Sequence, residues 1–390
     1  MTLDSVASLA GRNFRAGKAF ELIVFDRLPP EEQTFLAEMR ADPDFYGILR
    51  PRPGTGRTIK SVTRDTALLW LTLQSPGPLP FFVFSGDAEA AVKAVWEFVL
   101  DGVLEMEENG SFVAGSEAAD LLSNGRRSVT QGRLARLSML ALRYGEKLGF
   151  DDPQLLAGWL YQFGRQPVSP FWARRLANSE AVLAFLGAGT GSDLRQRLDA
   201  DWEIRKDAEA QGWLAWMNRR RGEVGQSKVT HKLYISPQVE EMPDVFATVL
   251  GVLSTRSAHF KIGSDAAGLL RPDKMVVYFG DQDSLLEVAL ELAKQLSSVA
   301  PHGVPFSAEI TPNGLLSWGM DPPQTVHVLT WQEPESWRQW VVRRLAAAMI
   351  AAQSNSHATM TPADFALERL RHEGVDVDDW KPTASIWHTT

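Results

Sequence analysis

The chain of 390 residues contains no cysteine. This absence excludes disulfides, thiolate nucleophiles and cysteine-ligated metal sites. The seven histidines include no pair at the spacing of helical metal ligands, so no metal site is predicted. The sequence also lacks a run of about 18 apolar residues, and its first residues lack a basic segment followed by a long apolar one. We therefore expect a soluble, cytoplasmic protein that does not enter a membrane.

Motifs for nucleotide cofactors are also missing. Residues 11 to 18 resemble a phosphate loop, but one residue too many lies between Gly11 and Gly17, and neither Ser nor Thr follows Lys18. Gly54-Thr55-Gly56 is too short for a dinucleotide fingerprint, and no Gly-x-Ser-x-Gly elbow is present. The sequence predicts no cofactor.

An excess of basic residues is absent as well. Asp and Glu number 48 and Lys and Arg 40, which gives a net charge of −8. General nucleic-acid binding depends on neutralising phosphates with surplus Lys and Arg, so nucleic acid is not an expected partner. The shares of hydrophobic residues, 44%, and charged residues, 23%, are those of a globular protein.

Residues 1 to 125 are predicted to form a winged-helix-like domain. Residues 87 to 101 have the apolar periodicity of a helix, and Asn109-Gly110 is a two-residue hairpin signal in the segment 103 to 114. With an earlier helix at 66 to 73, the order is helix, helix, hairpin. This outline resembles winged modules that hold precursor peptides in bacterial peptide-modifying pathways, although many winged helices are spacers or protein-contact modules. The elements predicted ahead of them are a strand at 20 to 25, a helix at 28 to 36 and a loop at 47 to 56.

The remainder divides into a helical region, residues 126 to 225, and a mixed α/β domain with terminal helices, residues 226 to 390, so that the chain belongs to the α+β class. The helices predicted in the middle region span 132 to 148, 152 to 163, 170 to 186 and 195 to 218. The elements predicted in the last region are strands at 232 to 236, 260 to 262 and 275 to 279, and helices at 242 to 253, 283 to 297, 335 to 352 and 361 to 372.

Short motifs in the last region resemble a known family. Lys232-x-Tyr234-x-Ser236, Phe260-Lys261, and Arg271-x-x-Lys274 before a strand ending in Tyr278 resemble the lyase domains of class III and IV lanthionine synthetases, which are similar to bacterial phosphothreonine lyases. Other motifs look more like the stand-alone type III effector-like lyases of class V lanthipeptide and thioamitide clusters, and these are Ala177-Asn178, Asp201-Trp202-Glu203-Ile204 and Ser317-Trp318-Gly319. The resemblance covers roughly residues 170 to 350.

The resemblance implies elimination of phosphate from a phosphoserine or phosphothreonine in a peptide or protein substrate. Lys261 matches the family's base, and Lys232, Arg271 and Lys274 match the positions that hold the phosphate. A lysine can act as a base when burial and neighbouring cations lower its pKa. A kinase must supply the phosphorylated substrate, because this chain offers no nucleotide site.

Two departures from the family pattern open an alternative. Tyr234 stands where the synthetases carry an acid histidine, while His231 lies on the opposite strand face by alternation. Tyrosine can also act as an acid. The arginines that the family carries after Gly303 are missing, since residues 309 to 323 contain none. The alternative is a lyase-like scaffold that has lost the reaction and binds a peptide or partner protein, with a winged-helix DNA regulator as a third, weaker reading.

Each candidate side chain also has an ordinary structural explanation. Lys261 could be a strand-end lysine whose stem covers the core while its ammonium stays in water. Tyr234 could be a half-buried strand aromatic, and Arg271 and Lys274 could be loop charges. The sequence leaves open whether these groups converge on one anion.

Overall fold

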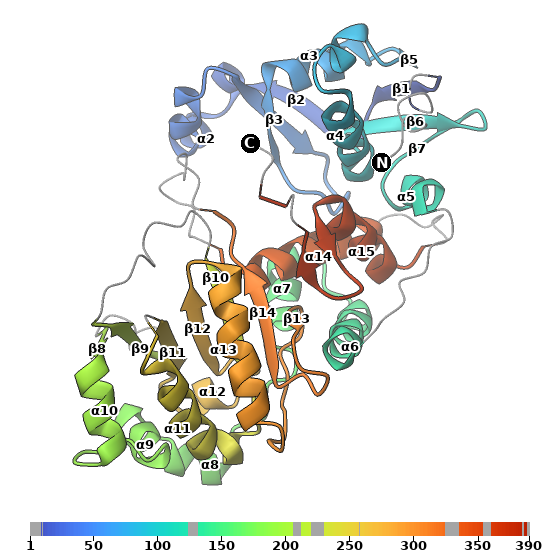
Figure 1. Ribbon diagram of the computed structural model, residues 1–390. Helices are drawn as coiled ribbons and strands as arrows, with labels where there is room; N and C mark the ends of the chain where they lie inside the picture. Colours follow the sequence, from blue (N-terminus) through green and yellow to red (C-terminus); the bar gives the residue numbers. More distant parts are fainter. Residues whose placement is uncertain are drawn as a thin grey trace.

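A computed structural model describes residues 9, 11–123, 132–205, 212–219, 230–256, 258–323, 335–353, 360–383 and 386–387. Figure 1 shows an upper region built from the first part of the chain, a lower region around a large sheet, and C-terminal helices between them. The described strands form four sheets, and their paired strands are antiparallel. The predicted α+β class is confirmed. None of the described helices is long and apolar enough to cross a membrane.

The N-terminal region carries the predicted succession of helix, helix and hairpin. Asp87 caps the second helix, where its side chain accepts hydrogen bonds from two backbone N–H groups, and Gly102 ends that helix with a φ of 69°. The turn of the hairpin uses positive φ at Asn109 and Gly110, 50° and 78°, as the dipeptide predicted. The helices involved are α3 (Arg64–Thr72) and α4 (Ala88–Asp101), and the hairpin strands are β6 (Leu104–Glu108) and β7 (Ser111–Val113).

Two sheets complete this region, in the orders β5-β1-β6-β7 and β2-β3-β4. The predicted loop at 47 to 56 is wrong in its first half, because β3 runs through it to Pro51. Gly47 permits this, since a side chain there would meet the backbone carbonyl of Ile23 on β2. The remaining elements are β1 (Asn13–Ala16), β2 (Phe20–Val24), η1 (Phe25–Arg27), α2 (Pro30–Phe35), η2 (Ala37–Ala41), β3 (Phe45–Pro51), β4 (Lys60–Thr63), β5 (Gly77–Pro78), η3 (Phe81–Phe84) and α5 (Ser116–Ser123).

The middle region departs from the prediction in two places. The helix expected at 170 to 186 is two helices, because Asn178 caps a new helix by accepting a hydrogen bond from the Ala181 N–H. The helix expected at 195 to 218 is wrong beyond Asp201, since Trp213–Asn218 pairs as a strand with residues 260 to 263. The elements are α6 (Arg133–Lys147), α7 (Pro153–Gln162), α8 (Pro170–Arg175), α9 (Ser179–Phe185), α10 (Asp193–Asp201), β8 (Trp202–Ile204) and β9 (Trp213–Asn218).

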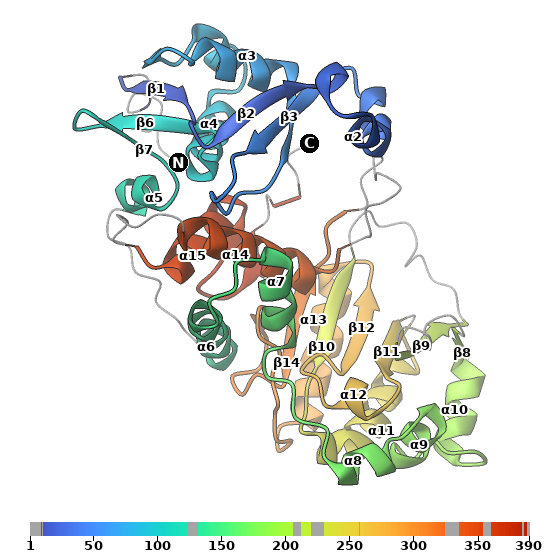
Figure 2. The same cartoon turned by 180° about the vertical axis from the view of Figure 1, so that it is seen from behind.

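A seven-stranded sheet in the order β13-β14-β10-β12-β11-β9-β8 forms the centre of the lower region. Helices α11 and α13 cover one of its faces, and Figures 1 and 2 show both helices along that face. Leu233, Phe246, Phe260 and Val288 are buried between the sheet and these helices. The elements are β10 (His231–Ile235), η5 (Val239–Glu241), α11 (Met242–Leu253), β11 (His259–Gly263), α12 (Ala266–Leu269), β12 (Met275–Phe279), α13 (Gln282–Gln295), β13 (Ala308–Glu309) and β14 (Leu316–Met320).

The C-terminal helices α14 (Trp337–Gln353) and α15 (Pro362–His372) pack on each other and on α6 and α7. Their core includes Trp337, Leu345 and Phe365, together with Trp380, which is 0% exposed between β15 (Val375–Asp376) and β16 (Lys381–Pro382). Arg369 of α15 also forms an ion pair with Asp101 at the end of α4. The C-terminal helices therefore connect the large sheet with the N-terminal region.

Candidate active site

The register of the large sheet decides which side chains share the face opposite α11 and α13. Lys232 on β10 pairs with Tyr278 on β12, while Tyr234 and Lys261 both pair with Val276. Directly paired residues of neighbouring strands point to the same side of a sheet. Lys232, Tyr234 and Lys261 therefore lie on one face, and alternation sends the intervening residues into the apolar core.

Lys261 lies in an aromatic environment. Its ammonium nitrogen is 4.0 Å from the centroid of the Trp213 ring and 5.9 Å from that of Tyr278. It forms no ion pair with any described residue. Burial, and next the charge of Lys232, lower the pKa of Lys261 from 10.5 to about 8. At pH 7 about one molecule in ten would therefore carry a neutral amine here, which is the protonation state of a base.

Lys232 lies on the same face of the sheet as Lys261 and has a counter-ion. Its ammonium nitrogen is 2.5 Å from a carboxylate oxygen of Asp321 and 5.4 Å from the centroid of the Tyr278 ring. Asp321 also accepts a hydrogen bond from the Trp337 N–H, so it is held at the start of α14. An ammonium has three N–H donors, and the pairing with Asp321 leaves donors for a further anion.

Arg271 also contacts the Trp213 ring, with its guanidinium carbon 4.7 Å from the ring centroid. Its Nε and Nη2 donate to the two carboxylate oxygens of Asp273 at 2.6 and 2.9 Å, and Nη2 also donates to the Tyr161 hydroxyl at 3.3 Å. Nη1 has no hydrogen-bond acceptor among the described residues. The bidentate contact therefore fixes the guanidinium while one of its amino groups stays available.

Asp273 is the centre of a buried network behind Arg271. Its carboxylate accepts from the Tyr161 hydroxyl at 3.0 Å and lies 2.9 Å from Nη1 of Arg338. Burial alone would raise the pKa of Asp273, but the charges of Arg338 and Arg271 outweigh it and hold that pKa well below its ordinary value. Burial, and next the charge of Asp273, raise the pKa of Tyr161 to about 12. Arg338 is 1% exposed and also donates to the carbonyls of Pro305 and Tyr161.

Tyr234 is 3% exposed and packs with Val276, Val304 and Tyr278. Its hydroxyl makes no hydrogen bond within the described part of the chain. Burial, and next the charge of Asp321, raise the pKa of Tyr234 well above 10, so the hydroxyl keeps its proton at neutral pH. A protonated phenol without a fixed acceptor can donate to a ligand.

Lys274 does not share the surroundings of the other three cations, contrary to the expectation that it joins them. It is 0% exposed, and its ammonium donates to the Pro237 carbonyl at 2.6 Å and lies 2.7 Å from Nδ1 of His302. Nε2 of His302 contacts the Gly164 carbonyl at 2.6 Å. Burial lowers the pKa of Lys274 to about 7, and burial with the charge of Lys274 lowers that of His302 to about 4. The placement of Lys274 favours a structural role that ties together three loops.

Sequence reasoning missed most of the partners of these cations. Asp273 lies inside the quoted motif from Arg271 to Lys274, where its position between two cations was a usable signal. Tyr161, Asp321 and Arg338 come from three distant segments, and nothing in the sequence relates them to Arg271. Phe306 and Trp318 are 0% and 8% exposed, so both aromatic side chains are packed in the interior.

Comparison with known proteins gives a distant structural likeness. No protein-family model matches the chain, and no curated protein does. The effector protein from Pseudomonas syringae pv. tomato strain DC3000 is similar over 64% of this chain and 98% of its own, with 15% identity and a TM-score of 0.38. The type III effector and phosphothreonine lyase OspF from Shigella flexneri is similar over 43% of this chain and 90% of its own, with 14% identity and a TM-score of 0.27. At these values the function proposed below has to rest on the residues of the site.

Proposed function

We propose that the chain eliminates phosphate from a phosphoserine or phosphothreonine residue of a peptide substrate, and that Lys261 is the base. The observation that carries this proposal is the state of Lys261, a lysine without an ion pair among the described residues, with a pKa lowered to about 8 and flanked by two cations. Such a lysine is suited to remove a weakly acidic α-proton near neutral pH.

In the proposed reaction the neutral amine of Lys261 takes the α-proton of the phosphorylated residue. The electron pair of the broken Cα–H bond forms the Cα=Cβ double bond, and the Cβ–O bond breaks as its electrons leave with the phosphate. The products are a dehydroamino acid in the peptide and inorganic phosphate. The step needs no oxidant, water or cofactor.

Lys232 and Arg271 would hold the phosphate during this step. Both have donors left after their contacts with Asp321 and Asp273, and each shares an aromatic ring with Lys261. Cations fixed beside a leaving group stabilise the negative charge that develops on it. Lys274 is not part of this proposal, because its ammonium is fully buried against Pro237 and His302.

Tyr234 would assist the leaving phosphate by donating its proton to the oxygen that separates from Cβ. It lies on the same face as Lys232 and Lys261, and its hydroxyl has no competing acceptor among the described residues. The kinase that phosphorylates the substrate would be a separate protein of the same peptide-modification pathway.

The test is to incubate the full chain with a synthetic phosphoserine peptide and to follow the peptide mass. Elimination gives dehydroalanine, which an added thiol converts to a stable adduct, whereas hydrolysis gives serine and no adduct. Lys261→Met should abolish the adduct, because methionine keeps an unbranched apolar side chain of similar length and has no base. Lys294→Met, which changes an exposed lysine on α13, is the matched control and should retain activity.

A lyase-like scaffold that binds phosphopeptides without reacting is the second candidate. The ion pairs with Asp321 and Asp273 favour it, because they already use some of the N–H groups with which Lys232 and Arg271 would hold a leaving phosphate. Fluorescence anisotropy with a labelled phosphopeptide and its unphosphorylated match separates the two candidates. Phosphate-dependent binding with no thiol adduct in the mass assay would establish the scaffold and end the case for the lyase.

A further inference from the structure

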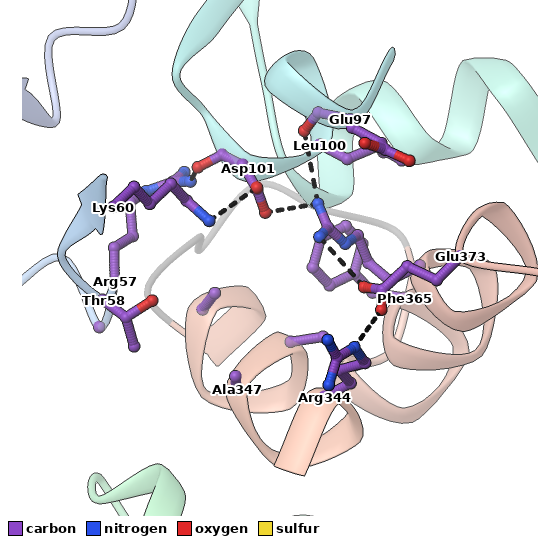
Figure 3. A pocket seen from close by; sticks show the side chains of 14 residues that line it. Arg57, Thr58, Lys60, Glu97, Leu100, Asp101, Arg344, Ala347, Phe365 and Glu373 are labelled. Carbon is purple, nitrogen blue, oxygen red and sulfur yellow. Dashed lines mark hydrogen bonds and ion pairs between the residues drawn. The ribbon is translucent and has the colours of Figure 1, made fainter. Parts of the chain in front are cut away.

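A cavity of about 480 Å³ lies between the N-terminal region and the C-terminal helices, away from Lys261 (Figure 3). One wall comes from residues 56 to 58 between β3 and β4, from Lys60 at the start of β4, and from the last turn of α4. The opposite wall comes from α14, α15 and Glu373. A volume of this size is that of sites that hold small organic ligands.

Two carboxylates in the wall, those of Asp101 and Glu373, are already paired with cations. Asp101 lies 2.7 Å from the ammonium of Lys60 and 2.5 Å from the guanidinium of Arg369. Glu373 lies 2.5 Å from Arg344 and 3.4 Å from Arg369. The pair between Asp101 and Arg369 joins the two regions, as a dashed line in Figure 3 shows, whereas the others lie within one region each.

Among the cations of the cavity wall, Arg57 is the one that forms no ion pair with a carboxylate in the described part of the chain. Its guanidinium donates to the backbone carbonyl of Asp101. Burial lowers the pKa of Arg57 even though the carboxylates of Asp101 and Glu105 act against that change. A half-buried guanidinium in this state is stabilised by any anion that reaches its free N–H groups.

The floor of the cavity is apolar and built from small residues. Ala347, Ala348 and Ala351 of α14 face it, and Phe365 of α15 lies beside them. In Figure 3 Ala347 lies below the open space, with Arg57 and Lys60 on one side and Arg344 on the other. The alanines leave room for the apolar body of a ligand to cover this floor.

We propose that this cavity binds a small organic carboxylate, whose anionic group contacts Arg57 and Lys60 and whose apolar body lies on the alanines of α14. The wall contains four cationic side chains and three carboxylates, with Glu97 as the third. This leaves an excess of one positive charge. A monoanion neutralises that charge, whereas a phosphate dianion would leave a net negative charge in the cavity. Arg57 supplies the planar pair of donors that a carboxylate accepts.

The test uses the full chain and two probes of the same shape, phenylacetate and its uncharged match phenylacetamide, in isothermal titrations. Phenylacetate should bind, and phenylacetamide should bind roughly tenfold more weakly or not at all, because a hydrogen bond to a charged group is worth about that factor or more. Arg57→Met should weaken phenylacetate by a similar factor. Arg52→Met is the matched control, since Arg52 is an exposed arginine on the same loop outside the cavity wall and should leave the affinity unchanged.

Ala347→Leu provides a second test that leaves every charge in place. The added carbons would fill the floor, so phenylacetate binding should be lost while the thermal midpoint of the unliganded protein stays the same or rises. The proposal is overturned if phenylacetate does not bind the unaltered chain, if the amide binds equally well, or if both Arg57→Met and Ala347→Leu bind phenylacetate as the unaltered chain does.

Discussion

Removing the charge of Lys232 should raise the pKa of Lys261. Both ammonium groups lie near the Tyr278 ring, at 5.4 and 5.9 Å from its centroid, and the Lys232 charge is the second cause, after burial, of the lowered pKa of Lys261. The variant Lys232→Met keeps an unbranched stem of similar length and deletes the ammonium. Lys261 should then hold its proton to higher pH.

The magnitude follows from the two ring distances, which together put the ammonium groups at most about 11 Å apart. At that limit and an effective dielectric constant of about 20, two unit charges repel by about 1.5 kcal/mol, which corresponds to about one pKa unit. In this variant the carboxylate of Asp321 has lost the ammonium of Lys232, and its negative charge also raises the pKa of Lys261. The pKa of Lys261 should therefore rise from about 8 to about 9 or above.

The assay is competitive acetylation of lysines with acetic anhydride across a range of pH, followed by mass spectrometry of the peptide that contains Lys261. It reports the neutral fraction of this amine directly and does not depend on any activity of the protein. If the chain is a lyase, the acid limb of its pH–rate profile should move with the labelling curve. The rate at pH 7 should fall by at least about tenfold, because the variant also removes a cation proposed to hold the phosphate.

Two further variants of the chain decide whether the change in the pKa of Lys261 is electrostatic. The double variant Lys232→Met with Asp321→Asn removes both members of the ion pair, so the pKa of Lys261 should return toward about 8. Lys294→Met, on the surface of α13, should not move it. A Lys261 that titrates near 10.5 in the unaltered chain would refute the reasoning, and so would one whose pKa is the same in Lys232→Met.

Three more outcomes are expected. Tyr234→Phe should lower the rate of phosphate elimination by roughly a hundredfold, while thermal unfolding shows little change because the hydroxyl makes no described hydrogen bond. Arg338→Met should lower the free energy of unfolding by about 3–5 kcal/mol in denaturant titrations, because it removes one of the two cations that balance the buried charge of Asp273. The control Arg256→Met, which breaks an exposed ion pair, should lower it by less than about 1 kcal/mol. The pKa of Lys274 is about 7 in the folded chain, so above pH 7 the unfolded chain binds one more proton at this lysine than the folded chain does. The free energy of unfolding should therefore rise by up to about 1.4 kcal/mol per pH unit from pH 7 to 9. Lys274→Met should remove this rise in urea titrations at pH 7 and pH 9.

The sequence was sufficient to predict the limits of those helices and strands whose ends are marked by nearby residues. The strand at Met275–Phe279 and the helix at Met242–Leu253 have the predicted limits, because a strongly apolar run and a proline in the first turn mark them in the sequence. Thr361 likewise caps the last long helix. The segment Trp213–Asn218 has no such marker. Its strand conformation depends on pairing with Phe260 and its neighbours, a long-range contact that periodicity cannot reveal.

The candidate site divides in the same way. Lys232, Lys261 and Arg271 were identified as a group from short motifs, and the sheet register and the Trp213 ring bring them to one face, although their roles stay predictions. The expectation for Lys274 failed to foresee its burial because Pro237 and His302, which surround it, lie far away in sequence. Counter-ions are generally hard to infer, since an ion pair leaves no trace in the spacing of either residue.

These counter-ions bear on how the proposed reaction would be balanced. Around Lys261 the described cluster holds three other cations, Lys232, Arg271 and Arg338, and two carboxylates, Asp273 and Asp321. One positive charge therefore remains before substrate binds, which favours the neutral amine. A bound phosphate dianion reverses that sign and raises the pKa of Lys261 again. Release of the lysine proton is thus easiest before the phosphopeptide arrives, and the two carboxylates, which hold Lys232 and Arg271 in position, also limit how far the empty site can lower the pKa of its base.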